Sequence, residues 1–283
     1  MSGTRIACVV DNRAGGGLLA EHGLSLLIET AGERILFDTG AGVALLPNAA
    51  KLGLDLGAVT RIVLSHSHDD HTGGLGALDP VCPIHVVAGI EVPSYSRQPG
   101  RPMHPLGMPD ASLAVLKKAD VRTVDGLSEI ADGVWLSGPI ARVDPLEHVR
   151  GFSFDPEGAL PCRVPEEQAL LTADGVLVTG CCHAGIVNTV ESFRAHADLP
   201  RIRMIVGGLH LCRADGREIE RVVEYLNGLG LERVVLLHCT GEEAGERLMS
   251  ALGCLVEWGY SSWVRFLEGH HQVKRRSGEA AFR

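Results

Sequence analysis

The first part of the chain alternates short apolar runs with turn-forming residues. The apolar runs are rich in Val, Ile and Leu and are bounded by Gly, Asp and Asn, which is typical of β-strands joined by turns. Strands are predicted at residues 5–10, 24–30, 34–40, 61–66 and 83–88. Between the third and fourth strands, Leu and Ala at helical spacing surround Pro47, and Gly53 suits a helix end. A helix between two strands indicates an α/β protein.

The middle of the chain has a less regular pattern. Residues 89–120 contain five prolines and predict a long loop or lid, with an ordinary surface excursion as the alternative. Strands are predicted again at residues 121–125 and 133–138, followed by a hairpin over residues 168–180 that turns at Asp174.

The last part alternates helices with strands. Helices are predicted at residues 186–196, 215–229 and 242–252, and strands at residues 203–208, 233–238 and 261–267. The sequence contains no dense Pro, Gly and Ser linker and no repeat of about 20–50 residues. We therefore expect one domain over residues 1–268, in which two similar layers face each other, and a disordered polar tail over residues 269–283.

Composition narrows the class of protein. The chain has 283 residues, 45% of them hydrophobic, and a net charge of −9. Because the only basic run is Lys274–Arg276, we do not expect nucleic-acid binding. The eight cysteines show no CxxC spacing and no signal segment is evident, so we expect reduced thiols in a cytoplasmic protein. No apolar run approaches the ~20 residues of a membrane helix, so we expect a soluble protein with no membrane partner.

One polar stretch stands out against this background. SHSHDDHTGGL, residues 65–75, follows the apolar run RIVL and contains His66, His68, Asp70 and His71. Imidazole nitrogens and carboxylates are ligands for Zn²⁺, and a strand end followed by a glycine-rich turn can aim all four side chains to one side. A solvated polar loop would have to collect three histidines here by chance. We therefore predict a metal site that serves one ion or two neighbouring ions.

Further ligands have to come from elsewhere in the chain. His183, His210 and His238 each follow the carboxyl end of a predicted strand, where open α/β sheets place their sites. His183 and His238 are predicted to be ligands, and His210 a ligand or a substrate contact. The other histidines lack this placement and are expected to be ordinary, although His22 and His104 could line the cleft. This group consists of His22, His85, His104, His148, His196, His270 and His271.

SHSHDDHTGGL resembles the H-x-H-x-D-H signature of the metallo-β-lactamase fold hydrolases. EHGLSLLIET, ILFDTG, TGCCHAGIVNT, VGGLHL and LHCTG resemble one branch of that family. The branch includes proteins named as metal-dependent hydrolases and the archaeal dihydropterin-ribofuranosylaminobenzene-phosphate synthase. The resemblance spans roughly residues 5–267 and rests on ordered motifs rather than on one.

The resemblance implies an αββα sandwich of two mixed β-sheets flanked by helices, with a dinuclear metal site. It assigns the first ion to His66, His68 and His183, and the second to Asp70, His71 and His238. It also implies that Asp38 fixes a ligand histidine through its other ring nitrogen, although a turn-capping role for Asp38 is an alternative.

One position departs from the family pattern. Most members end the hairpin strand in Gly-Asp, whose carboxylate bridges the ions, whereas this chain has Gly180-Cys181-Cys182. A thiolate from Cys181 or Cys182, a hydroxide, or the carboxylates of Glu166 or Glu167 could take that place. Both cysteines could instead be small buried residues, so the number of ions stays open.

Hydrolysis is the reaction that this site predicts, because a bound Zn²⁺ activates water and polarises a carbonyl or phosphoryl oxygen. Mn²⁺ and Fe²⁺ also suit such ligands. Asp70 is predicted to orient the attacking group and His210 to stabilise developing charge. Arg97, Arg101 and Arg142 favour a small phosphorylated ester as substrate.

Two other functions remain open at this point. The first is a transferase that condenses a dihydropterin diphosphate with an arylamine-type acceptor. The second is a metal-binding sensor without turnover. A homo-oligomer is also left open.

Overall fold

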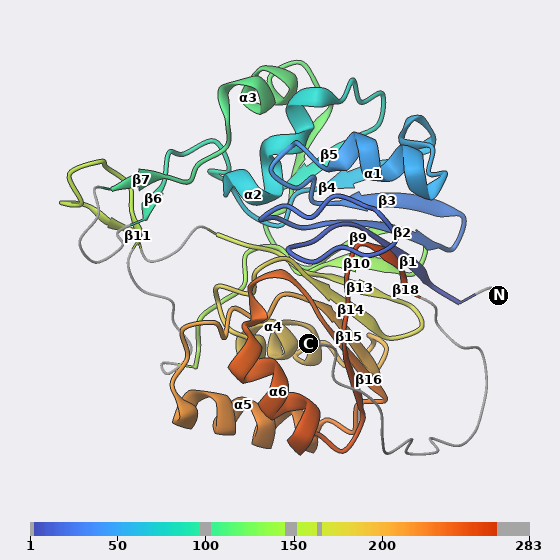
Figure 1. Ribbon diagram of the computed structural model, residues 1–283, viewed down its shortest axis with the longest axis vertical. Coiled ribbons are helices and arrows are strands. Elements are labelled where there is room, and N and C mark those ends of the chain that lie inside the picture. The colour runs from blue at the N-terminus through green and yellow to red at the C-terminus, as the bar shows by residue number, and fades with distance from the viewer. Residues whose placement is uncertain (1–2, 97–102, 145–151, 163–165, 265–283) are drawn as a thin grey trace.

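Two seven-stranded sheets face each other, and helices cover both outer faces (Figure 1). The computed structural model describes residues 3–96, 103–144, 152–162 and 166–264. The expected αββα sandwich is confirmed. None of the helices in these ranges is long and apolar enough to cross a membrane.

The first sheet has the strand order β18-β1-β2-β3-β4-β5-β8. Its strands are β1 (Arg5–Val10), β2 (Ser25–Thr30), β3 (Glu33–Phe37), β4 (Arg61–Val63), β5 (Ile84–Val86), β8 (Val121–Thr123) and β18 (Ser262–Val264). The strands are antiparallel from β18 to β3 and parallel from β3 to β8. Helix α1 (Leu45–Leu52) and the 3-10 turn Leu56–Ala58 connect β3 to β4. Helix α1 ends at Gly53, as predicted, and this glycine adopts the left-handed conformation (φ 68°).

The second sheet has the strand order β17-β16-β15-β14-β13-β10-β9. Its strands are β9 (Ser128–Ala131), β10 (Val134–Leu136), β13 (Leu170–Thr172), β14 (Val176–Thr179), β15 (Met204–Gly207), β16 (Arg233–Leu236) and β17 (Leu255–Trp258). The strands from β14 to β17 are parallel. Helices α4 (Ile186–Arg194), α5 (Gly216–Gly228) and α6 (Glu242–Ala251) cover its outer face. Asp215 caps α5 by accepting bonds from two amides of its first turn.

Three apolar clusters correspond to the three interfaces of the sandwich. Leu26 and Ile28 point into the cluster between the sheets, together with Val178 and Val206 of the second sheet. Leu27, between them, points outward to the cluster beneath α1. Strands that are buried on both faces need apolar residues at successive positions, which explains the continuous hydrophobic runs in the sequence.

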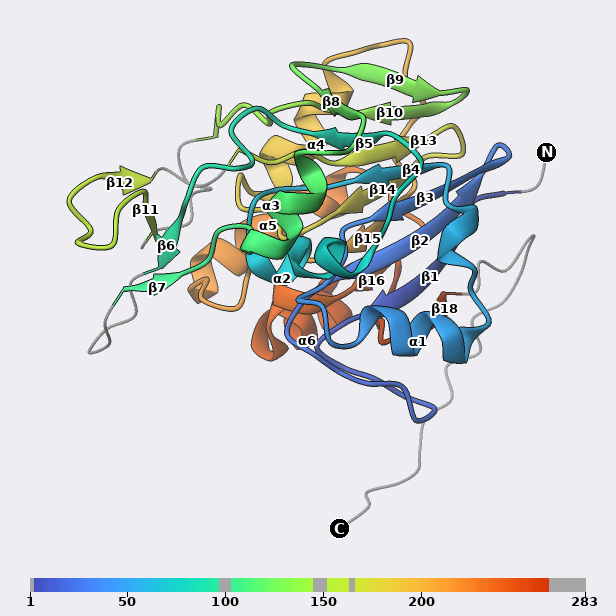
Figure 2. The same cartoon turned by 90° about the horizontal axis from the view of Figure 1, so that it is seen from above.

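A small third sheet projects from the sandwich on the side of helix α2 (Asp69–Thr72) (Figures 1 and 2). It consists of β6 (Tyr95–Ser96), β7 (His104–Pro105), β11 (Phe152–Ser153) and β12 (Pro161–Cys162). The segment predicted as a loop or lid therefore contributes β6, β7 and helix α3 (Asp110–Leu116). The amide of Asp69 donates to the carbonyl of Leu106 over 2.7 Å, which ties this segment to α2.

Several predicted boundaries were wrong. Strands predicted to reach residues 40 and 66 end at Phe37 and Val63, because the chain turns toward the site there. Strands β9, β11, β12 and β17 were not predicted, since they are short or carry charged residues. The last strand is confirmed as far as Val264. The tail predicted to be disordered lies outside the described residues.

Candidate metal centre

The carboxyl edges of the parallel strands from both sheets meet at one end of the sandwich. β3 and β4 are parallel neighbours, and Asp38 and His66 follow them. On the other side, Thr179, Gly207 and Leu236 end β14, β15 and β16 in register, and a histidine follows each strand within a few residues. Parallel strands bring their carboxyl ends to the same edge, so His183, His210 and His238 arise from one edge of the second sheet.

The SHSHDDH stretch leaves β4 and forms the single turn of helix α2, where a simple turn was predicted. His66 and His71 are fully buried, and His68 is 4% exposed. Buried imidazoles need partners for their ring nitrogens. Within the described residues, the Nε2 atom of His68 is buried without a hydrogen-bond partner.

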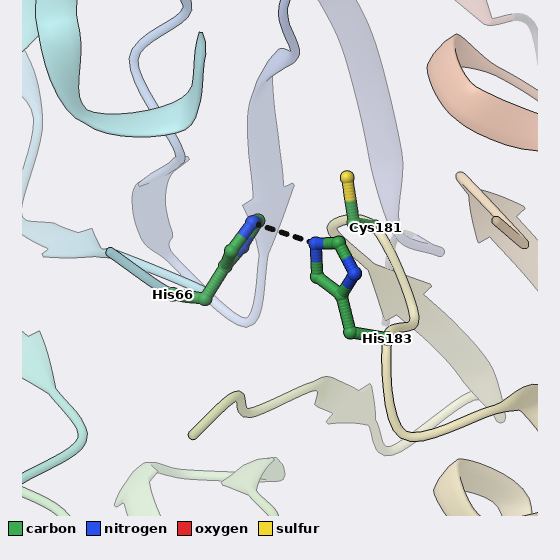
Figure 3. Close-up of side chains that lie close together, drawn as sticks. All are labelled: His66, Cys181 and His183. Carbon is green, nitrogen blue, oxygen red and sulfur yellow. Dashed lines mark hydrogen bonds between the residues drawn. The ribbon is translucent and has the colours of Figure 1, made fainter. Parts of the chain in front are cut away.

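His66 and His183 form the first pair of facing rings. Their Nε2 atoms are 3.3 Å apart, and Figure 3 shows the rings pointing toward one another with Cys181 beside them. The ligand atoms of His66, Cys181 and His183 all lie within 4.8 Å of one another. His68 also packs against this pair, with ring centroids 4.6 Å from His66 and 4.8 Å from His183.

His71 and His238 form the second pair. Their Nε2 atoms are 3.2 Å apart, and the Nε2 atom of His71 is 3.1 Å from the Sγ atom of Cys181. The carboxylate of Asp70 lies 3.3 Å from the Nε2 atom of His238. The sulfur of Cys181 therefore lies beside both pairs, at the position that the family resemblance led us to expect for a bridging ligand.

These donor atoms fit a metal ion. Two nitrogens that face each other at about 3 Å can share at most one proton, whereas a cation between them would accept both lone pairs. Burial, followed by repulsion from neighbouring histidines, holds the pKa of His66 and of His183 well below the usual range. Burial lowers the pKa of His68 to about 3. Neutral imidazoles and a cysteine that loses its proton on binding form a donor set that suits Zn²⁺.

Asp38 supports the candidate ligands of the first sheet. Its Oδ2 atom lies 2.7 Å from the Nδ1 atom of His71, and its Oδ1 atom accepts a 2.7 Å bond from the amide of Ser65. The Ser65 hydroxyl lies between Asp38 Oδ2 (2.7 Å) and the Nδ1 atom of His66 (2.9 Å). Gly180 makes room for this network, because a Cβ atom there would lie 2.2 Å from the hydroxyl.

Different residues support the ligands of the second sheet. The amide of His238 donates to Asp11 Oδ1 over 2.7 Å, and Asn12 Oδ1 lies 2.9 Å from the Nδ1 atom of His238. The amide of His183 donates to Glu167 Oε2 over 2.8 Å. Each of these bonds fixes the orientation of a histidine that faces the centre.

Asp70 and Asp38 interact with the histidines of the second pair, and these interactions shift the pKa values of Asp70 and His71. Burial raises the pKa of Asp70, but His71, His238 and His68 outweigh it and hold that pKa well below its usual range. Burial lowers the pKa of His71, but Asp70 and Asp38 raise it to about 9. A proton on His71 and a cation beside it are thus alternative ways to balance the two carboxylates.

A cavity of about 600 Å³ opens onto these side chains. His22, Asp70, Cys181 and His238 line it, and the Nε2 atom of His22 is 3.2 Å from Asp70 Oδ2. Its lining also includes Arg13, Phe152, His210, Arg213, Cys239 and Trp258. The expectation that His22 could line the cleft is confirmed, whereas His104 is exposed on β7 and is not among the lining residues.

Some predicted site residues lie elsewhere. Cys182 packs in the apolar cluster beneath α4 to α6, with its sulfur 3.3 Å from the hydroxyl of Thr189. Glu166 is exposed, and Glu167 accepts bonds from the backbone amides of His183 and Ala184 instead of facing the histidine pairs. Burial raises the pKa of Glu167, and Arg142 lies close enough to oppose that rise; Arg142 is not among the residues that line the cavity. Arg97, Arg101, His148, His270 and His271 lie outside the described residues.

Sequence reasoning missed Asp11, Asn12, Ser65 and Cys239. Ser65 and Cys239 are immediate neighbours of His66 and His238, so position next to a ligand was a usable signal. Asp11 and Asn12 follow the first predicted strand, but only the fold reveals that they reach a histidine more than 200 residues away.

Backbone strain is concentrated at this end of the sandwich. The non-glycine residues with positive φ among the described positions are Ala31, Asp38, Cys182, His210 and His238. Side chains rarely adopt this conformation, and its cost has to be offset by the surrounding contacts. Four of these five residues immediately flank or form the centre.

Comparison with known proteins agrees with the fold and the site. Residues 19–142 match the model of the metallo-beta-lactamase superfamily. An uncharacterized protein of Methanocaldococcus jannaschii is 30% identical over 249 residues, which cover 86% of this chain and 93% of that protein. The chain belongs to the metallo-β-lactamase superfamily.

Two further relatives indicate the branch. The 7,8-dihydropterin-6-methyl-4-(beta-D-ribofuranosyl)-aminobenzene-5'-phosphate synthase of M. jannaschii is 30% identical over 253 residues, which cover 81% of this chain and 84% of the synthase. A solved metal-dependent hydrolase of the beta-lactamase superfamily is 30% identical, with a TM-score of 0.82, and the match covers 93% of this chain and 99% of that structure.

Proposed function

We propose that this protein is a metal-dependent hydrolase of a small, phosphorylated ester. One observation carries the proposal: two pairs of buried imidazole nitrogens, His66 with His183 and His71 with His238, face each other around Cys181 at the wall of a cavity. His68 and Asp70 complete the donor set. When bound, one or two divalent cations such as Zn²⁺ would lower the pKa of a water molecule and polarise the substrate oxygen.

Asp70 is proposed to orient the attacking water. Its carboxylate lines the cavity, and its side chain is 13% exposed. Because its pKa is held low by His71 and His238 despite burial, Asp70 accepts a hydrogen bond well but retains a proton poorly. The neighbouring His22 side chain, 74% exposed, offers a route by which that proton reaches solvent.

His210 is proposed to stabilise negative charge that develops on the substrate. Burial lowers its pKa, but Cys239 and Glu167 outweigh that effect and raise it above the usual value. A protonated imidazole at the cavity wall donates a hydrogen bond to an oxyanion. Its ring centroid lies 4.3 Å from that of His183, so the charge would develop beside the first pair.

Arg13 and Arg213 support a phosphorylated substrate in place of the arginines suggested by the sequence. Both line the cavity. The guanidinium of Arg13 lies 3.9 Å above the ring of Trp258 and 3.1 Å from a carboxylate oxygen of Glu242, which holds it in place. An oriented guanidinium binds a phosphate through two parallel hydrogen bonds.

The test combines metal content per chain with cleavage of bis-p-nitrophenyl phosphate. Wild type is expected to bind metal and to cleave this ester only when loaded. His66→Ala should lose metal and activity together, whereas His196→Ala, a histidine near the end of α4 and away from the cavity, should behave as wild type. Absence of bound metal in the wild type would refute the proposal.

A second candidate is a transferase that joins a dihydropterin diphosphate to an arylamine-type acceptor. The named synthase among the relatives favours it, as do the aromatic rings of Phe152 and Trp258 in the cavity lining. Tight binding of 7,8-dihydropterin that is lost in Trp258→Ala, together with metal-dependent diphosphate release and no cleavage of the phosphodiester, would favour this candidate. Bound metal with neither reaction would favour a sensor.

A further inference from the structure

A second group of ligand atoms lies beside the histidine pairs. Cys181, His210 and Cys239 follow β14, β15 and β16, and their ligand atoms all lie within 4.8 Å of one another. All three residues line the cavity, so an ion in solution can reach them. A zinc ion bound by two thiolates and an imidazole holds its ligand atoms roughly 3.5–4 Å apart, given bond lengths of about 2.0–2.3 Å.

The backbone leaves space for this arrangement. A Cβ atom at Gly208 would lie 2.7 Å from the sulfur of Cys239 and 3.5 Å from the Cα atom of Cys181. The missing side chain therefore lets the sulfur of Cys239 extend across the end of β15 toward Cys181. That sulfur also lies 3.3 Å from the carbonyl oxygen of Cys181.

His210 is held in an uncommon conformation at the same place. Its φ is 49°, in the left-handed region that non-glycine residues rarely adopt. The Nδ1 atom of His210 is buried, with no hydrogen-bond partner among the described residues. A strained backbone and an unsatisfied ring nitrogen both indicate that the ring position serves a ligand.

Simple burial does not account for the two cysteines. Cys8 and Cys182 belong to apolar clusters of the core, which is the usual situation of a free cysteine. Cys181 and Cys239 are also buried but belong to none of these clusters, and they line the cavity instead.

We propose that Cys181, His210 and Cys239 form a separate cation site beside the histidine pairs, which takes a thiophilic divalent ion of the zinc type. All three residues line the cavity, from which a water molecule could supply a further ligand, and the sulfur of Cys181 also lies beside the histidine pairs. The ion would carry the positive charge that a protonated His210 supplies without it. The site goes beyond the proposed function, because it binds its ion whether or not the chain cleaves an ester.

The test is an anaerobic titration of the metal-free, full-length protein with Co²⁺, followed by sulfur-to-cobalt charge-transfer absorption and by metal content per chain. Cys239→Ala should bind one ion fewer and lose roughly half of the charge-transfer intensity, because one of two thiolate ligands is gone. Cys212→Ala removes another thiol of the cavity wall and should titrate as wild type. His66→Ala should lose ions from the histidine pairs but keep sulfur-to-cobalt absorption.

His210→Ala tests the same site independently, in case Cys239→Ala does not fold. It removes a partly exposed side chain that follows a different strand. It should also bind one ion fewer while its circular dichroism matches wild type. Two results would show that the proposal is wrong. One is a folded His210→Ala protein that binds as many ions as wild type. The other is a folded Cys239→Ala protein that binds as many ions as wild type with unchanged charge-transfer absorption. Either result would leave the hydrolase proposal intact, since the latter depends on the outcome for His66→Ala.

Discussion

The two halves of the molecule supply the candidate centre in different ways. The first half concentrates His66, His68, Asp70 and His71 in six consecutive positions after β4. The second half supplies single histidines after three parallel strands, together with two cysteines. A local motif can be recognised in the sequence. Ligands that are far apart in the sequence can be recognised as one site only once the sheet brings the strand ends together.

The supports of the two sets differ in the same way. In the first half, the single carboxylate of Asp38 holds both His71 and Ser65, and Ser65 in turn contacts His66. The ligands of the second half have separate supports: Asp11 and Asn12, which follow β1 of the first half, hold His238, while Glu167 holds the His183 loop. Loss of a support of the first set should therefore affect several ligands, whereas loss of a support of the second set should remain local.

The largest effect is expected for Cys181→Ala. This thiol contacts both histidine pairs, so its loss should remove at least one ion per chain and the metal-dependent activity with it. Cys182→Ala is the matched control, because the adjacent thiol faces the core; it should keep its metal and lose about 1 kcal/mol of stability. Elemental analysis and urea unfolding measure both. Equal metal content in the two variants would contradict the central position of Cys181.

Asp38→Asn should have the next largest effect. The amide cannot replace the charge that orients His71, so metal affinity should fall by about 10–100-fold, the usual consequence of losing an outer partner. Asn12→Ala tests the support of the second set of ligands and should cause a smaller loss of affinity, because His238 keeps its backbone bond to Asp11. Competition with a chromogenic chelator gives both affinities. A larger loss in Asn12→Ala would reverse the comparison.

Glu167→Gln should affect stability more than chemistry. The NH2 group of the new glutamine is a donor and would face a backbone N–H, which is also a donor. At least one charge-assisted hydrogen bond is therefore lost, which should lower the free energy of unfolding by ~1.5–3 kcal/mol. Glu166→Gln, on the exposed neighbour, is the control. Urea unfolding of the metal-free proteins checks the difference. No change in the free energy of unfolding of Glu167→Gln would show that the carboxylate does not hold the His183 loop.

The smallest effect is expected for Asp215→Ala at the start of α5. Loss of this cap should lower stability by about 1 kcal/mol without changing metal content, because α5 lies on the outer face of the second sheet. Thermal unfolding and elemental analysis measure the two quantities. A change in metal content would mean that the outer helices of this half also control the site.

Much of the architecture could be predicted because local pattern determined it. The hairpin at Asp174, helix α1 with its end at Gly53 and the strand-helix alternation after residue 180 all follow from spacing and turn residues. Strands such as β17 were missed because Glu257 and exposed positions interrupt the apolar pattern. The small third sheet could not be predicted, since two-residue strands carry no periodicity.

Part of the candidate site could also be predicted from the sequence. The placement of His183, His210 and His238 after strands could be inferred from sequence, and the family resemblance suggested that Asp38 bonds a ligand histidine, although not which one. The distinction between Cys181 and Cys182 could not, because adjacent residues point in opposite directions and only the packed sheet reveals which one faces the cavity. The roles of Asp11 and Asn12 depend on contacts between distant segments.

Because ligands come from both sheets, a bound cation would act as a cross-link between the halves of the sandwich. An ion that binds the folded chain alone adds about 4 kcal/mol of stability when its free concentration is ~1,000 times its Kd. A chelator should therefore lower the unfolding temperature as well as stop turnover. Metal supply would then determine how long each molecule survives, in addition to how fast it works.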